Sequence, residues 1–125
     1  MIQEKVIVPH RLRQVPTQFS WLDQRLIRQG RLRDCEPPAW ALYLFLCAVG
    51  DEQGLSYYSD ASLGRELRLD APSLSQARTQ LIGADVVAFQ KPLWQLLSLD
   101  PPTERAGGTR SMAEVLRAVF QGGAP

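Results

Sequence analysis

The chain has 125 residues, of which 45% are hydrophobic, and its formal net charge at pH 7 is only +1. That length supports one domain with a modest core and argues against a two-domain enzyme. No apolar run reaches the roughly 18 residues of a membrane span, and the N-terminal residues lack the apolar segment of a signal peptide, so we expect a cytoplasmic protein without membrane contact.

Residues 1–16 are predicted to form an extended basic arm. The segment MIQEKVIVPHRLRQVP combines a β-branched run with two prolines and alternating arginines, which favours extended backbone over helix. Arg11 and Arg13 are candidate phosphate contacts, as in the basic arms of several DNA-binding folds, and the alternative is a solvated arm.

Residues 17–30 are predicted to form an amphipathic helix. Its expected buried stripe consists of Phe19, Leu22 and Leu26. Its opposite face is expected to present an aromatic side chain among cations, at Trp21, Arg25 and Arg28. Such a face has three interpretations: the arginines bind a nucleic-acid backbone, the tryptophan anchors a dimer, or the face is solvated.

Residues 39–50, AWALYLFLCAVG, are predicted to form the core helix. Apolar residues occupy every face of this segment, and such a helix is tolerated only where other elements cover most of it. Pro37 and Pro38 are expected at the start of this helix. The segment DEQG then breaks the helix, and LSYYS at residues 55–59 is short enough for a single strand.

Two helices separated by a turn are predicted over residues 59–84. Ser59 or Asp60 is expected to cap the first helix. Asp70 is expected to cap the second, with Pro72 in its first turn, where the missing N–H is not needed. The buried face of the second helix is expected to hold Leu74, Ala77 and Leu81.

The outward face of the second helix is short and polar. It is expected to hold Pro72, Ser75, Gln76 and Thr79, with Arg78 and Gln80 at its flanks. Gln pairs with adenine, Ser and Thr hydroxyls donate or accept, and Arg binds guanine or phosphate, so this face suits a DNA major groove. The alternative is an ordinary solvent-facing stripe.

Residues 86–99 change to a β pattern. VVAFQ and LWQLLSL predict two strands of a hairpin with Lys91 and Pro92 at the turn. The resulting order of helix, strand, helix, helix, strand and strand predicts a winged helix-turn-helix over residues 17–99. The expected fold class is therefore α+β, mainly α with a small β wing, and with an additional helix at each end.

The stretch from Tyr43 to Phe89, in particular YYSDASLGRELRLDAPSLSQARTQLIGADVVAF, resembles winged helix-turn-helix regulators and the DNA-binding domains of plasmid replication initiators. SLGRELRL stands where the family has the helix before the turn, SLSQARTQL where it has the Ser/Thr-rich helix, and LIGADVVAF where the chain enters the wing. The resemblance implies groove contact by Ser73, Ser75, Gln76, Arg78, Thr79 and Gln80. It also implies phosphate contact by Ser59, Gln90 and Lys91.

Residues 100–110 are predicted to be a linker, and residues 111–121 a last amphipathic helix. Ser111 and Glu114 form a capping-box pattern. The apolar stripe of this helix consists of Met112, Val115, Leu116, Val119 and Phe120. Because so short a helix is unstable alone in water, it is expected to fold back on its own core, to close a homodimer, or to bind a partner protein.

The basic charge lies outside the region predicted to bind DNA. Residues 1–35 hold seven cationic side chains and three carboxylates, whereas residues 36–100 hold four and eight, so the two parts carry +4 and −4. Duplex affinity depends largely on Lys and Arg, and we therefore expect the N-terminal part to supply phosphate contacts. The same split leaves open a protein-binding adaptor within a larger complex.

The side-chain inventory argues against an enzyme. The chain has one histidine, His10, and no HExxH, GxSxG, Walker A or GxGxxG motif. Cys35 and Cys47 match no metal or redox spacing and are expected to be reduced structural thiols, with no metal or cofactor. The expected function is sequence-specific binding of double-stranded DNA by a homodimer, as a transcriptional regulator or as an accessory factor in replication or in a mobile element.

Overall fold

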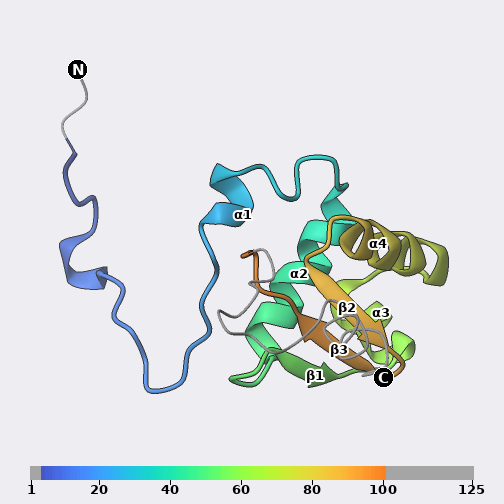
Figure 1. Ribbon diagram of the computed structural model, residues 1–125. Coiled ribbons are helices and arrows are strands. Elements are labelled where there is room, and N and C mark those ends of the chain that lie inside the picture. Colours follow the sequence, from blue (N-terminus) through green and yellow to red (C-terminus); the bar gives the residue numbers. More distant parts are fainter. Residues whose placement is uncertain (1–3, 101–125) are drawn as a thin grey trace, which may run out of the picture.

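The structure, a computed structural model, describes residues 4–100 of the chain. A 3₁₀ turn at Pro9–Arg11 precedes four helices and three strands (Figure 1). These are α1 (Arg25–Arg28), α2 (Pro37–Val49), β1 (Leu55–Tyr57), α3 (Asp60–Leu67), α4 (Ala71–Gly83), β2 (Val87–Gln90) and β3 (Leu93–Leu96). The predicted helix 111–121 and its apolar stripe lie outside the described residues, as does nearly all of the predicted linker.

The fold is α+β, with a small antiparallel sheet in the order β1-β3-β2. The predicted order of helix, strand, helix, helix, strand and strand is confirmed from α2 to β3. On the central strand, Trp94 lies opposite Ser56 of β1 and Phe89 of β2. Because side chains alternate along a strand, the buried Trp94 faces the helices and the neighbouring Gln95 faces outward.

The core lies between α2, α4 and the inner face of the sheet. Its helical members are Leu26 of α1, Ala39, Leu42, Tyr43 and Leu46 of α2, Leu63 of α3, and Leu74, Ala77 and Leu81 of α4. The stripe predicted for α4 is thereby confirmed. Each fully buried leucine contributes on the order of 1.5–3 kcal/mol relative to an exposed one.

Of the two cap candidates for α3, the structure has Ser59 at the cap and Asp60 as the first helical residue, and Asp70 caps α4 as predicted. Ser59 Oγ accepts a hydrogen bond from Ser62 N at 3.1 Å, and Asp70 Oδ1 accepts one from Ser73 N at 2.8 Å. The helix α3 ends at Arg68, whose φ of 59° is left-handed. These local bonds orient α4 directly after a tight turn.

Gly64 allows this turn to close. The Leu69 amide donates to the Gly64 carbonyl at 3.0 Å, and a Cβ at Gly64 would lie 3.0 Å from the Leu69 carbonyl oxygen. A larger residue there would require the Leu69 carbonyl to shift by a few tenths of an ångström.

The helix predicted over residues 17–30 is wrong, because the structure has only the single turn α1. Phe19 and Leu22 are 65% and 47% exposed, so only Leu26 of the expected stripe is buried. Asp23 Oδ1 accepts from Arg25 N at 2.9 Å, and this bond starts the helical turn late. The residues before it include Thr, Phe, Ser and Trp, which form helices poorly, and no element of residues 4–100 covers their apolar side chains.

Residues 4–22 form an arm in which every residue is exposed. Figure 1 shows this segment running apart from the body formed by α2, α3, α4 and the sheet. Ser20 Oγ donates to the Ala48 carbonyl at 3.3 Å, where the arm meets the C-terminal end of α2. Within residues 4–100, no helix has both the length and the apolar character that crossing a membrane requires.

Candidate nucleic-acid interface

The helix α4 presents a polar face on the side opposite its core residues. Ser75, Gln76 and Thr79 are exposed there, as the sequence predicts, and Ile82, 45% exposed, ends the same face. Thr79 Oγ1 donates to the Ser75 carbonyl at 3.0 Å, which orients the hydroxyl and leaves it able to accept. The exposed Gln76 amide offers both a donor and an acceptor, the pair that recognises adenine in a major groove.

Arg78, predicted at the flank of this face, instead points into the domain. Its Nη2 donates to Asp60 Oδ1 at 2.6 Å, and its side chain is 16% exposed. Its Cζ lies 4.5 Å from the ring centroid of Phe89 and 5.5 Å from that of Trp94. Arg78 therefore joins α4 to α3 and to the sheet, and its guanidinium is not available to read a base.

Ser73 and Gln80 are also engaged within the fold. Gln80 Oε1 accepts from Glu36 N at 2.8 Å and so satisfies an amide at the start of α2. Hydrogen bonds from the Ser73 side chain and backbone lower the pKa of Asp70, which keeps that N-cap charged. The predicted groove contacts that remain available on α4 are Ser75, Gln76 and Thr79.

The predicted phosphate contacts Ser59, Gln90 and Lys91 meet at one end of the sheet. The Tyr58 amide donates to the Pro92 carbonyl at 3.3 Å, so the β2–β3 turn lies beside the residue that precedes Ser59. All three side chains are exposed. Lys91 supplies the single cation of this turn.

Two exposed arginines near α4 were not among the predicted contacts. Arg68 lies in the turn, two residues before the N-cap of α4, and Arg65 lies on the last turn of α3. Arg65 Nη2 donates to Ser62 Oγ at 3.3 Å. Their positions beside the LDAP turn were visible in the sequence, and cations there stand next to the helix that would enter a groove.

The predicted face of Trp21, Arg25 and Arg28 does not form, because Trp21 precedes α1. Arg25 is ion-paired with Asp23 at 2.7 Å and with Asp100, and these bonds lower the pKa of both carboxyls. The guanidinium of Arg25 is therefore paired with two carboxylates of its own chain. Trp21 is 76% exposed, and Arg28 is exposed on α1.

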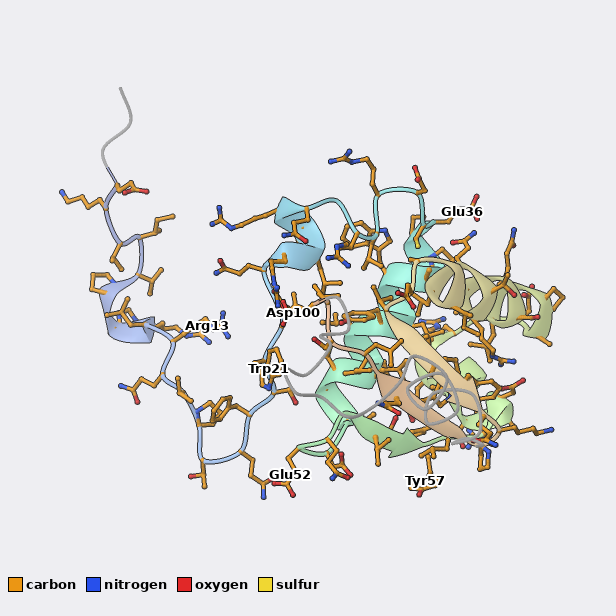
Figure 2. All side chains as sticks on the ribbon, viewed as in Figure 1. Arg13, Trp21, Glu36, Glu52, Tyr57 and Asp100 are labelled. Carbon is orange, nitrogen blue, oxygen red and sulfur yellow. The ribbon has the colours of Figure 1, made fainter. Side chains whose placement is uncertain are left out.

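The arm does not bring its arginines to α4. Arg13 lies on the arm, on the other side of the body from α4 (Figure 2). Arg11 belongs to the 3₁₀ turn of the same arm. Within residues 4–100 of one chain, the exposed cations of this region are therefore Arg65 and Arg68, which precede α4, and Lys91 at the β2–β3 turn.

A cleft of about 580 Å³ lies where the arm meets the body. Four carboxylates line it, at Asp23, Asp51, Glu52 and Asp100, together with Trp21 and Arg25.

Burial raises the pKa of the Cys47 thiol in this cleft, and burial and Asp34 raise the pKa of the Cys35 thiol. Both cysteines are free, as predicted, and residues 4–100 contain no group of three or more acidic, His or Cys residues arranged for a metal.

No protein-family model, no curated protein and no solved structure matches the chain.

Proposed function

We propose that the protein binds double-stranded DNA sequence-specifically through a winged helix-turn-helix formed by α2, α3, α4 and the sheet. In this proposal α4 enters the major groove and the β2–β3 turn is the wing. The role is that of a transcriptional regulator or of an accessory factor in replication or in a mobile element.

The observation that carries the proposal is the polar outward face of α4. Ser75, Gln76 and Thr79 are exposed side by side, while two capped helices and a glycine-dependent turn hold α4 in place. Three polar side chains on one helix face are better suited to contact base edges than to form a protein interface, because protein interfaces are enriched in aromatic residues, Met and Arg.

Phosphate contacts in this proposal come from the periphery of α4. Arg65 and Arg68 are exposed before α4, and Lys91 is exposed at the wing end of the sheet, whereas the Ser59 hydroxyl accepts from Ser62 N and donates to Ser62 Oγ as the cap of α3. Contact by Arg11 and Arg13 of the arm stays a prediction. Few cations per chain favour a homodimer, because two half-site readers on palindromic DNA combine their binding free energies.

Selection from random duplexes, followed by titration at two salt concentrations, tests the proposal. We expect an enriched site, and Gln76→Ala should lose about 1–3 kcal/mol of binding at one base position. The matched control is Gln95→Ala, because Gln95 is exposed on the outer face of the sheet and should not affect binding.

The salt dependence identifies which arginines bind phosphate. Removing one arginine that neutralises a phosphate should flatten the slope of log affinity against log salt by roughly 0.9. We expect this for Arg68→Ala, and the double replacement of Arg11 and Arg13 tests the arm in the same way. Absence of an enriched site together with no binding at low salt would contradict DNA binding.

A second candidate is a protein-binding adaptor, which the outer face of α2 favours. Trp40 and Leu44 are 38% and 63% exposed on that face, and residues 36–100 carry a charge of −4. An acidic domain with an apolar patch suits a protein partner. Failure of the DNA selection, with a folded protein, would leave this function.

A further inference from the structure

The outer face of α2 is apolar, and residues 4–100 leave it uncovered except at its C-terminal end, where Ser20 Oγ of the arm donates to the Ala48 carbonyl. The sequence predicts a core helix covered on most sides, yet Trp40 and Leu44 are 38% and 63% exposed. Ala41 and Ala48 are also exposed, and residues 40, 44 and 48 are spaced along one side of the helix. The indole is held in place because Trp40 Nε1 donates to the Cys35 carbonyl at 3.1 Å.

The arm carries the complementary surface. Its large apolar side chains are each 41% exposed or more, at Val6, Ile7, Val8, Leu12, Val15, Phe19, Trp21 and Leu22. Ile7 is 93% exposed. So many uncovered apolar side chains on one short segment indicate a surface that is buried against something else.

Charge and length match the arm to α2. The helix contains no charged residue, but exposed carboxylates flank it at Glu36 and Asp51, about 22 Å apart along the helix axis. Within the arm, residues 5–13 hold Val6, Ile7, Val8 and Leu12, with the cations Lys5 and Arg13 at the two ends of this segment and Arg11 inside it. With the 3₁₀ turn kept, Lys5 and Arg13 lie about 24 Å apart along an extended chain.

We propose that the protein is an arm-exchanged homodimer, in which residues 5–13 of each chain lie along the outer face of α2 of the other. Each chain carries one arm and one face, so a two-fold axis makes both contacts at once and closes the assembly. The arm already runs away from its own body (Figure 1). This inference specifies the contact of the homodimer proposed above, and the contact requires no DNA.

Two full-length variants test the exchange, one on each surface. Leu44→Glu damages the face and leaves the arm intact, whereas Ile7→Glu damages the arm and leaves the face intact. Light scattering after size exclusion, at tens of micromolar, should give twice the 14.0 kDa monomer mass for the unchanged chain and the monomer mass for each variant alone.

The equimolar mixture of the two variants is the decisive sample. The arm of the Leu44→Glu chain and the face of the Ile7→Glu chain are both intact, so a mixed dimer with one good contact should form. An affinity tag on one variant should then retain the other. A mixture that stays monomeric would overturn the proposal, because an intact arm and an intact face would then be present on different chains without binding each other.

Other outcomes also overturn the exchange. If the unchanged chain is monomeric, the protein does not form the proposed dimer. If the Leu44→Glu chain is dimeric, the outer face of α2 is not part of the dimer contact, and if the Ile7→Glu chain is dimeric, the arm is not part of it. Gln18→Glu and Ala61→Glu place the same charge at exposed positions outside residues 5–13 and outside the outer face of α2, and both variants should stay dimeric. Circular dichroism checks that each variant is folded.

The oligomeric state and DNA binding are measured separately, so the two proposals fail in different ways. A dimer that selects no duplex contradicts only the DNA-binding function. A monomer that selects a duplex contradicts only the arm exchange.

Discussion

The helices α2 and α4 are alike in length and packing but opposite in their outer faces. Each has 13 residues and a proline in its first turn, and the two pack against each other in the core. Outside, α2 exposes Trp40 and Leu44, whereas α4 exposes Ser75, Gln76 and Thr79, with Ile82 at its C-terminal end.

In the two proposals made above, this difference would place two kinds of recognition on one core. An apolar helix face gains free energy when a protein segment covers it, and a polar face gains little from that but matches the hydrogen-bonding groups of a major groove. Because the helices pack inner face to inner face, the two outer surfaces point away from each other. A protein contact on α2 and a DNA contact on α4 are therefore compatible at the same time.

The largest expected effect comes from the inner faces that the helices share. Leu74 is 1% exposed, and Leu74→Ala should lower the free energy of unfolding by about 2–5 kcal/mol. The same change at the exposed Leu44 should cost roughly 0.5 kcal/mol or less in dilute protein. Denaturant unfolding measures both, and the cost at Leu44 should grow with protein concentration if a second chain covers α2.

Replacing Arg78 and Gln76 separately compares a side chain that stabilises the fold with one that is proposed to contact a base. Arg78→Ala removes the ion pair with Asp60 and the stacking on Phe89, and should lower the free energy of unfolding by about 1–3 kcal/mol. Gln76→Ala should leave stability within roughly 0.5 kcal/mol. A stable Arg78→Ala chain with altered preference at one base would contradict the inward orientation of Arg78.

Acid should weaken the start of α4 through Asp70. Its folded-state pKa is lowered by hydrogen bonds from Ser73, so its stabilising contribution is complete above the unfolded-state value and is lost as pH falls through the folded-state value. Asp70→Asn keeps a cap but removes the titration, so its stability should fall less steeply below about pH 4. Thermal unfolding across pH 2–7 measures the slopes, and equal slopes would contradict this role.

Local patterns were sufficient to predict much of the body. The caps at Ser59 and Asp70, the buried spacing of α4 and the hairpin turn at Lys91 depend on neighbours within a few residues, and the structure agrees with each of them. The exposed Ser75, Gln76 and Thr79 follow from the same helical spacing. Local hydrogen bonds and periodicity determine such features before any distant contact forms.

Only the tertiary structure decided which polar side chains of α4 are free. Arg78 pairs with Asp60, 18 residues earlier, and Gln80 bonds the Glu36 amide, 44 residues earlier. The helix predicted over residues 17–30 failed for a related reason, because apolar spacing stabilises a helix only where another element covers the stripe. Periodicity shows which side chains could share a face, but burial and distant partners determine whether that face forms and what it contacts.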